Sequence, residues 1–252
     1  MINKIFNEDC LVTIDKMKQQ SLKINCIITS PPYNVDLGKT SKTSYSLYKD
    51  NKEHQEYIKW LSNIFDKCYD ILEDGGRLCI NIGDSKNGAI PTHSDIIQSL
   101  VNNGRYIMHS IIIWDKKHTN ARTCWGSWLS PSCPSYPTPF EYILIFSKNN
   151  RKLSWKGETD LTKEEFIENA YGIWTFSPEK SAKKIGHPAP FPIELPKRLI
   201  KMNTYVNDIV YDPFMGSGST ALACIKTDRR FIGSEIDPKY VKIAEERIDL
   251  VK

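Results

Sequence analysis

Residues 207–220, with the sequence NDIVYDPFMGSGST, decide the fold that this chain is expected to adopt. The apolar run at 209–211 is typical of a buried strand, Asp212 ends it, and Gly216-Ser217-Gly218 opens a helix. A glycine-rich turn between a strand and a helix lets backbone approach a ligand closely. It also directs the amides of the helix N-terminus at that ligand, as in dinucleotide-type sites. The alternative is a tight turn that only packs the helix against the strand.

A carboxylate at the end of the next predicted strand supports the ligand-binding interpretation. Residues 230–235 read as that strand, and Glu235 stands at its end. An acid roughly 20 residues beyond the glycines is the one that binds ribose hydroxyls in such sites. We therefore expect a ligand that carries a ribose.

Length and composition suit one large α/β domain, alone or with a small insert. The chain has 252 residues, of which 40% are hydrophobic and 25% charged, as in ordinary globular proteins. It contains no apolar run of membrane-spanning length, and its N-terminus lacks the apolar stretch of a signal peptide. We expect a soluble, cytoplasmic protein with no membrane partner. The formal charge of +4 permits an anionic partner without requiring one.

The cysteines do not predict a disulfide framework or a metal site. Seven cysteines are scattered without a Cys-x-x-Cys pair, at positions 10, 26, 68, 79, 124, 133 and 224. Disulfides, zinc and other metals are therefore not expected, and the cysteines are interpreted as small buried hydrophobic residues in a reducing compartment.

Helical and strand patterns alternate along the chain. Helices are predicted at 9–20, 54–73, 91–103, 190–202 and 238–251, and strands at 24–29, 77–83, 106–114, 141–147, 209–211 and 230–235. This order predicts an α/β fold, a doubly wound and mostly parallel sheet with helices on both faces. Residues 1–148 and 186–252 form the expected scaffold, and the less regular 149–185 reads as an insert.

A second loop is predicted to face the glycine-rich turn. Thr29-Ser30-Pro31-Pro32-Tyr33 follows the predicted strand 24–29, and parallel strands place the loops after their carboxyl ends on one side of the sheet. The two prolines fix the backbone and expose carbonyls, while Tyr33 presents an aromatic face. This combination suits a planar ligand with an exocyclic amine. The alternative is a turn that ends the strand and packs a tyrosine.

At these residues the chain resembles a known family. TSPPY at 29–33 and DPFMGSG at 212–218 are similar to the catalytic and S-adenosylmethionine motifs of DNA amino-methyltransferases of restriction–modification type. Those enzymes methylate N4 of cytosine or N6 of adenine. The order, catalytic motif first, is that of the circularly permuted β group. The resemblance runs from Asn7 to the last helix, with 149–185 unmatched, and implies the S-adenosylmethionine-dependent methyltransferase fold.

The resemblance implies which residues bind the cofactor. In this sequence they are Asp9, Cys10, Thr29, His187, Asp212, Pro213, Phe214, Gly216, Ser217, Gly218, Thr220 and Glu235. Asp212 would contact the amino group of the methionine part, and Glu235 the ribose hydroxyls. Simpler roles are open for three members of the set: a helix cap for Asp9, a core residue for Cys10, and a turn histidine for His187.

The resemblance also implies a catalytic set, Ser30, Pro31, Pro32 and Tyr33. Ser30 Oγ and the Pro31 carbonyl would accept the two amine hydrogens and free the nitrogen lone pair for in-line attack on the methyl group. Tyr33 would stack on a base flipped out of the duplex. No dedicated base is evident for the released proton, and water is expected to take it. In the family, serine at position 30 usually accompanies cytosine N4 methylation and aspartate adenine N6 methylation, so cytosine N4 is expected here, with adenine N6 as the alternative.

The interface with DNA is predicted from charge and from the insert. Basic and aromatic residues interleave in the loop after the catalytic segment, and four of them are expected to contact DNA: Lys39, Lys42, Tyr45 and Lys49. The insert 149–185 is the candidate target-recognition segment. Trp125 and Trp128 would lie near the flipped base or in the core. The expected partners are double-stranded DNA with a short site, a second copy of the chain, and a cognate restriction endonuclease.

Other functional classes remain open from sequence. A strand followed by Gly-x-Gly also serves ribose-containing redox cofactors, so an oxidoreductase is one alternative. A non-catalytic nucleic-acid-binding module is another, in which Ser30-Pro31-Pro32-Tyr33 would be only a turn. A methyltransferase for small molecules, RNA or protein glutamine is a nearer one.

Overall fold

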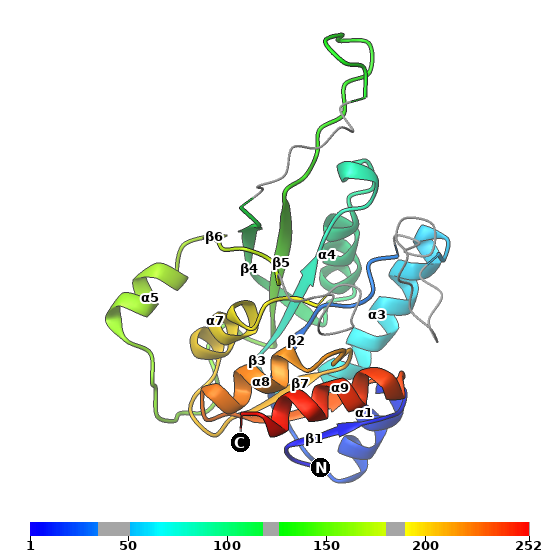
Figure 1. The fold of residues 1–252 in the computed structure, drawn as a ribbon. Coiled ribbons are helices and arrows are strands. Elements are labelled where there is room, and N and C mark those ends of the chain that lie inside the picture. The colour runs from blue at the N-terminus through cyan, green and yellow to red at the C-terminus, as the bar shows by residue number, and fades with distance from the viewer. Residues whose placement is uncertain (35–50, 118–125, 180–189, 252) are drawn as a thin grey trace.

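A sheet of eight strands forms the centre of the computed structural model, which describes residues 1–34, 51–117, 126–179 and 190–251 (Figure 1). In sheet order the strands are β1 (Lys4–Phe6), β8 (Arg230–Ser234), β7 (Ile209–Asp212), β2 (Ile24–Thr29), β3 (Leu72–Ile82), β5 (Phe140–Lys148), β4 (Tyr106–Asp115) and β6 (Ile173–Thr175). The helices are α1 (Cys10–Gln19), α3 (His54–Ile71), α4 (Thr92–Asn102), α5 (Lys163–Asn169), α7 (Glu194–Asn203), α8 (Ser219–Lys226) and α9 (Pro238–Asp249), with a short 3₁₀ turn at Lys86–Gly88.

The sheet is mostly parallel, which confirms the predicted fold class. Only β5 among the described strands runs against its neighbours, β3 and β4. Its first residue, Phe140, is therefore paired with Asp115, the last residue of β4. The amino end of β5 and the carboxyl ends of β2, β3, β4, β7 and β8 consequently share one edge of the sheet, called here the carboxyl edge.

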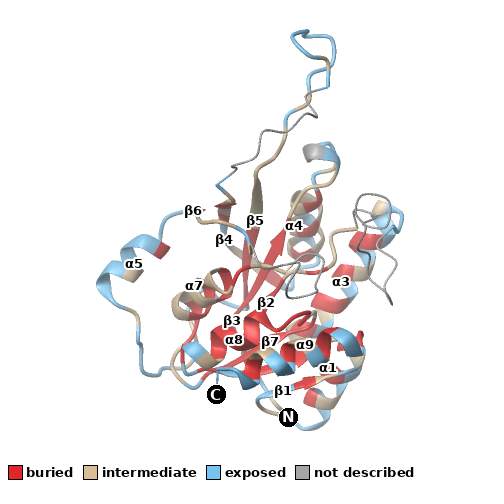
Figure 2. Cartoon of the chain, in the orientation of Figure 1, coloured by how far each residue is buried: buried red, intermediate tan, exposed pale blue. Residues whose placement is uncertain are grey.

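Helices cover both faces of the sheet. In β2, Ile27 packs into a core with α1, α3 and α4, whereas Cys26 and Ile28 pack into a second core with α7, α8 and α9. This alternation follows from the period of two in a strand. The central strands are buried on both faces (Figure 2), which explains why they read as continuous apolar runs in the sequence.

Three short elements and one helix boundary differ from the prediction. The strands β1 and β6 and the helix α5 were not predicted, because three residues are too few to show a period. A signal for α5 was present, since Thr162 and Glu165 form a capping box at its start. The helix predicted from 190 begins at Glu194, and Pro196 is tolerated in its first turn, where no amide has a helical partner.

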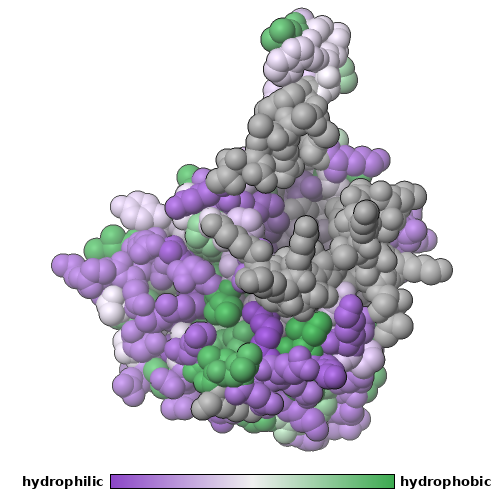
Figure 3. Space-filling model, viewed as in Figure 1, coloured by the Kyte–Doolittle hydropathy of each residue, from purple (hydrophilic) through white to green (hydrophobic). Residues whose placement is uncertain are grey.

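A hairpin projects from the carboxyl edge between β4 and β5. It is described over 126–139, where the Ser127 amide donates to the Cys133 carbonyl at 2.8 Å. Trp128 is 69% exposed and Leu129 88% exposed, and Figure 3 shows apolar surface at the tip of this projection. Packing of Trp128 in the core is therefore wrong, because the hairpin extends beyond the helices that would cover it. Trp125 lies outside the described residues.

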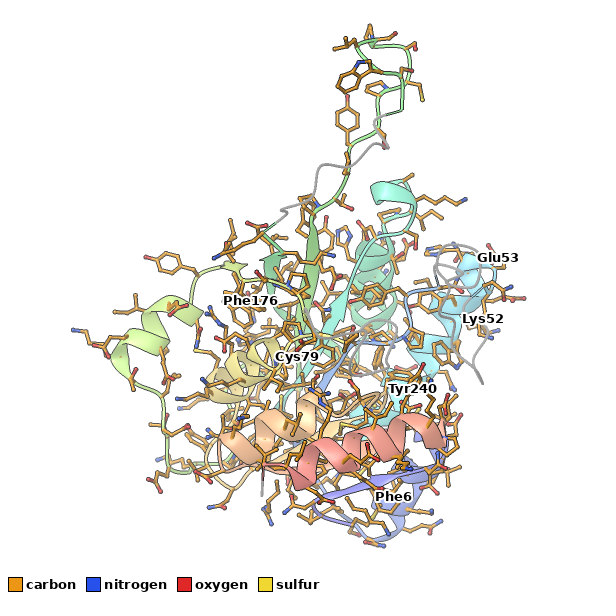
Figure 4. All side chains as sticks on the ribbon, in the orientation of Figure 1. Phe6, Lys52, Glu53, Cys79, Phe176 and Tyr240 are labelled. Carbon is orange, nitrogen blue, oxygen red and sulfur yellow. The ribbon has the colours of Figure 1, made fainter. Side chains whose placement is uncertain are left out.

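The described part of the insert, residues 149–179, lies along two different edges of the sheet. Its first half is fastened to the amino edge of the sheet, where Trp155 Nε1 donates to Asp208 Oδ2 at 3.0 Å just before β7 begins. Next, α5 packs on α7, with an ion pair of 2.6 Å between Glu168 and Arg198. Within the described part of the insert, residues 173–179 return to the carboxyl edge, where β6 pairs with the end of β4. Phe176, labelled in Figure 4, stacks there on Trp114 with ring centroids 5.3 Å apart.

Most described cysteines are buried, as expected. Five lie in the interior, namely Cys10, Cys26, Cys68, Cys79 and Cys224. Cys133 is the exception and is exposed, because it belongs to the projecting hairpin. Cys124 lies outside the described residues. No helix in the described ranges combines the length and apolar character needed to cross a bilayer.

Candidate active site

The two predicted loops meet at a buried carboxylate, Asp212. Thr29 Oγ1 donates to Asp212 Oδ1 at 2.7 Å, and Thr220 Oγ1 donates to Asp212 Oδ2 at 2.6 Å. The Phe214 amide donates to Oδ1 at 3.0 Å. These contacts form because β2 pairs with β7, so residues 183 positions apart in sequence become neighbours. Both oxygens of Asp212 are thereby held in place.

The surroundings of Asp212 favour a cationic ligand group. Its side chain is fully buried, and this burial raises the pKa of the carboxyl to about 6, against the opposing effect of the hydrogen bonds from Thr220 and Thr29. In the described part of the chain no basic side chain forms an ion pair with it. A buried carboxylate without a cation is costly, and an ammonium group would relieve that cost.

The glycine-rich turn depends on glycine at two positions. Gly216 and Gly218 have φ angles of 52° and 84°, in the left-handed region that L side chains rarely adopt. A Cβ on Gly218 would also lie 2.9 Å from the Ala244 Cβ, so glycine allows α9 to pack against this turn. Pro213 is buried within the same segment. The backbone of Ser217 is fixed by Arg247, whose guanidinium donates to the Ser217 carbonyl at 2.5 Å.

Glu235 lies beside this turn, at the end of β8. Its carboxylate accepts from the Gly216 amide at 2.8 Å and from the Asp237 amide at 2.9 Å. Burial raises the pKa of this carboxyl above its usual value. The structure thus brings Glu235 and the glycine-rich turn into direct contact, as the predicted spacing requires.

The N-terminal segment reaches the same edge. Asn7 Nδ2 donates to the Glu235 carbonyl at 2.9 Å, and Tyr211 Oη donates to the Cys10 carbonyl at 3.3 Å. Asp9 caps α1 by accepting from the Leu11 amide. Burial raises the pKa of the Cys10 thiol to about 12, so it stays protonated. The Asp9 side chain thus caps the helix and Cys10 is buried, while the Cys10 carbonyl contacts Tyr211 of β7.

Aromatic residues from other elements lie close to the glycine-rich turn and the start of α8. The ring of Phe214 lies 5.6 Å from that of Trp60 on α3. From the other side, Ser219 Oγ donates to the Phe191 carbonyl at 2.9 Å, which places the segment before α7 at the start of α8. His187 precedes that segment and lies outside the described residues, as do the predicted DNA contacts Lys39, Lys42, Tyr45 and Lys49.

Ser30 and Tyr33 are joined by their hydroxyls. Ser30 Oγ donates to Tyr33 Oη at 3.1 Å, and the Tyr57 hydroxyl fixes the loop by donating to the Pro32 carbonyl at 2.6 Å. The Tyr33 ring lies against Gly83 at the end of β3, where an added Cβ would be 3.3 Å from the ring. Pro31 is buried. The loop is thus held from three sides.

Three residues that sequence reasoning missed complete the site. Tyr33 Oη donates to Glu141 Oε2 at 2.8 Å, and Asn81 Nδ2 donates to both of these oxygens, at 2.6 and 2.7 Å respectively. Lys116 Nζ pairs with Glu141 Oε1 at 2.8 Å. Burial, with the nearby Glu141, raises the pKa of Tyr33 well above its usual value, so the phenol remains neutral. No signal in the sequence marks Glu141, because its place depends on the reversal of β5.

The arrangement can bind a ribose and an ammonium group beside hydrogen-bond acceptors for an amine. Among the described residues no group of three or more histidine, cysteine, aspartate or glutamate side chains could hold a metal ion.

Comparison with known proteins links this geometry to methyl transfer. A family model described as DNA methylase, N6_N4_Mtase, matches residues 24–246, a span that contains both loops. The type II methyltransferase M.MjaVI of Methanocaldococcus jannaschii is 38% identical over 164 residues, covering 64% of this chain and 80% of that protein. The type II methyltransferase M.MjaI of the same organism is 30% identical over 275 residues, covering 94% and 88%.

Solved structures share the whole fold. TTHA0409 of Thermus thermophilus, in complex with S-adenosyl-L-methionine, is similar with a TM-score of 0.74 and 25% identity, covering 98% of this chain and 93% of that chain. The PvuII DNA methyltransferase, which is cytosine-N4-specific, is similar with a TM-score of 0.71, covering 98% and 90%. It is 20% identical, so this second likeness concerns the fold alone.

Proposed function

This chain belongs to the DNA methylase family of N6 and N4 methyltransferases, and from that membership we propose that it methylates the N4 amine of a cytosine flipped out of double-stranded DNA. The methyl donor is S-adenosylmethionine, which TTHA0409 carries in its crystal structure. The observation that carries the proposal is the contact of Thr29 with Asp212, because it joins the loop suited to an amine to the loop suited to the donor.

The residues at the carboxyl edge fit this donor. Asp212 would receive the ammonium of its methionine part, since this buried carboxylate has both oxygens already oriented by hydroxyls. Glu235 would receive the ribose hydroxyls, beside the backbone of Gly216. Phe214, whose amide donates to Asp212, carries an aromatic ring that lies 5.6 Å from that of Trp60. When bound, S-adenosylmethionine supplies a sulfonium-activated, electrophilic methyl group.

The loop residues would prepare the amine. Ser30 Oγ and the Pro31 carbonyl accept its two hydrogens, which draws the nitrogen towards tetrahedral geometry and frees its lone pair. Catalysis then rests on positioning, since the amine and the methyl carbon are held in line. Ser30 in this position supports cytosine, by analogy with the family, and adenine N6 is the competing product.

The test is methylation of unmodified DNA with labelled S-adenosylmethionine, followed by analysis of the nucleosides. We expect labelled N4-methylcytosine. N6-methyladenine as the sole product would mean that the target base is adenine, and the assignment as a DNA methyltransferase would stand. NADH binding without S-adenosylmethionine binding would refute both the target base and the methyltransferase assignment. Ser30→Ala should abolish transfer, while Ser110→Ala, an exposed serine on β4, should not.

We further propose that the hairpin 126–139 and the later part of the insert 149–185 contact the DNA around the target base. The hairpin starts at the edge that carries Ser30 and exposes Trp128 and Tyr136, side chains that can stack on or between bases. The first half of the insert is held at the opposite edge. We also propose that the chain acts beside a restriction endonuclease with the same short site, because its relatives M.MjaVI and M.MjaI are named type II methyltransferases.

A further inference from the structure

Three oxygen atoms form a chain that leads from the amine position to a carboxylate. Ser30 Oγ donates to Tyr33 Oη at 3.1 Å, and Tyr33 Oη donates to Glu141 Oε2 at 2.8 Å. Both hydrogen bonds point the same way, towards Glu141. The lone pairs of Ser30 Oγ therefore remain available to accept a hydrogen from the amine.

The direction of this chain is fixed by Asn81 and Lys116. Asn81 is 2% exposed, and its Nδ2 donates to both Tyr33 Oη and Glu141 Oε2. Rotation of the Asn81 amide would place its oxygen against the carboxylate, so this orientation is the favoured one. Lys116 donates to the second carboxylate oxygen. Glu141 is thus held as an acceptor facing Tyr33.

We propose that Ser30, Tyr33 and Glu141 form the exit route for the proton that the methylated amine releases. This proposal rests on the proposed function. In the transition state of transfer, the nitrogen binds the methyl carbon, still carries two hydrogens and gains positive charge. One N–H bond breaks and its electron pair returns to nitrogen. The proton binds Ser30 Oγ as the proton of Ser30 passes to Tyr33 and that of Tyr33 passes to the Glu141 carboxylate, which becomes neutral.

The surroundings of each group suit this movement. The Tyr33 phenol is strongly disposed to stay neutral, so it must accept and donate together rather than form a phenolate. Glu141 is 14% exposed, whereas its partner Asn81 is buried. The carboxyl can therefore return the proton to solvent between turnovers. Glu141 acts through Tyr33 and is a positioning and accepting residue that does not touch the base.

The test uses Glu141→Gln and Tyr33→Phe in single turnovers with S-adenosylmethionine and substrate DNA. A general base contributes roughly 100-fold to 10,000-fold, so we expect each variant to transfer methyl groups at least about 100-fold more slowly. The dissociation constants of cofactor and DNA should stay within about threefold, since Gln and Phe keep the shapes of the side chains. The variant that carries both substitutions should be no slower than either single variant, because each substitution alone already interrupts the same proton route.

Two further readouts separate a proton route from a merely structural role. The wild-type rate should fall in D₂O, and this solvent isotope effect should be lost in both variants. A transient infrared band of a protonated carboxyl should appear during a wild-type turnover and be absent in Glu141→Gln. Tyr142→Phe and Glu246→Gln, a neighbouring tyrosine and an exposed glutamate on α9, serve as matched controls and should behave like the wild type.

The outcomes are distinguishable. Wild-type rates and isotope effects in both variants would overturn the proton route and leave the methyltransferase assignment intact. A wild-type protein that transfers no methyl group to any DNA would instead refute the proposed function. If Glu141→Gln does not fold, as judged by cofactor binding and thermal unfolding, Tyr33→Phe and the wild-type infrared band decide the question.

Discussion

The Thr29 hydroxyl donates a hydrogen bond of 2.7 Å to Asp212 Oδ1, although 183 positions separate the two residues in the chain. The bond joins the end of β2 to the end of β7, and Asp212 accepts a matching bond from Thr220 on the other side. One buried carboxyl is therefore shared by the segment proposed to prepare the amine and the segment proposed to bind the donor. The charge state of Asp212 therefore affects the contacts of both segments.

We expect Asp212 to impose a pH dependence on the stability of the cofactor-free protein. Burial raises its pKa from 3.8 to about 6, so between these values the folded chain holds a proton that the unfolded chain has lost. The contribution of Asp212 to the free energy of unfolding is therefore largest below the unfolded pKa of 3.8. It is lost as the pH rises through the folded pKa of about 6. The free energy of unfolding should be greater by about 1 kcal/mol near pH 5 than near pH 7 through this residue alone.

Urea unfolding of wild type and Asp212→Asn at the two pH values measures this contribution. The variant should lack the difference that the wild type shows, whereas Asp15→Asn, an exposed aspartate on α1, should retain it. If the difference in unfolding free energy between the two pH values were the same in wild type and Asp212→Asn, the carboxyl would already be ionised at the lower pH.

Glu235→Gln is predicted to weaken cofactor binding without loss of the fold. The amide keeps one acceptor beside Gly216 but removes the charge that strengthens bonds to hydroxyls. Hydrogen bonds to charged groups contribute roughly 1.5–3 kcal/mol, so the dissociation constant of S-adenosylmethionine should rise about 10-fold to 100-fold. Isothermal titration gives the value, and Glu245→Gln on α9 is the control. An unchanged constant would remove Glu235 from the proposed cofactor site.

Gly218→Ala should destabilise the protein more than Gly104→Ala does. Both glycines have positive φ angles, 84° and 73°, so both substitutions carry a similar backbone cost. Only at Gly218 would the new Cβ meet a neighbour, the Ala244 Cβ at 2.9 Å, while Gly104 has open space. We expect an extra loss of roughly 1–3 kcal/mol in the free energy of unfolding by urea. Equal losses would mean that α9 adjusts without cost.

Two tryptophans are predicted to respond in opposite ways to alanine substitution. Trp128 is 69% exposed on the hairpin, so Trp128→Ala should leave the thermal midpoint unchanged while it weakens DNA binding several-fold. Trp174, on β6, is 1% exposed and packs against Arg198 of α7, so Trp174→Ala should cost roughly 3–5 kcal/mol of unfolding free energy. Unchanged DNA affinity in Trp128→Ala would exclude the hairpin tip from the interface.

The meeting of the two loops could be predicted from sequence, because strands followed by Ser30 and by Asp212 must end at one edge if they are parallel. Glu141 could not be placed in this way. It begins a predicted strand, and in an all-parallel sheet the start of a strand lies at the amino edge, away from Ser30. Only the antiparallel pairing of β5 with β3 and β4 reverses this, and that pairing is set by long-range contacts that carry no local signal.

The path of the insert across the fold could not be predicted from the sequence either. Composition separates 149–185 from the scaffold, yet it says nothing of which edge the segment follows. Trp155 and Glu168 fix the path through single contacts with Asp208 and Arg198, residues that look unremarkable in their own helices and turns. Contacts of this kind depend on how distant segments pack together, and no local sequence motif predicts them.

The contact of Gly83 with the Tyr33 ring has a consequence for the descent of this family. A Cβ at position 83, directly after β3, would lie 3.3 Å from the Tyr33 ring, so the ring would have to shift by a few tenths of an ångström to accommodate it. The two positions are therefore expected to change together among homologues. A lineage that gains a larger residue at 83 should carry a different group at 33 or a relocated loop, and an alignment of homologues would reveal that linked inheritance.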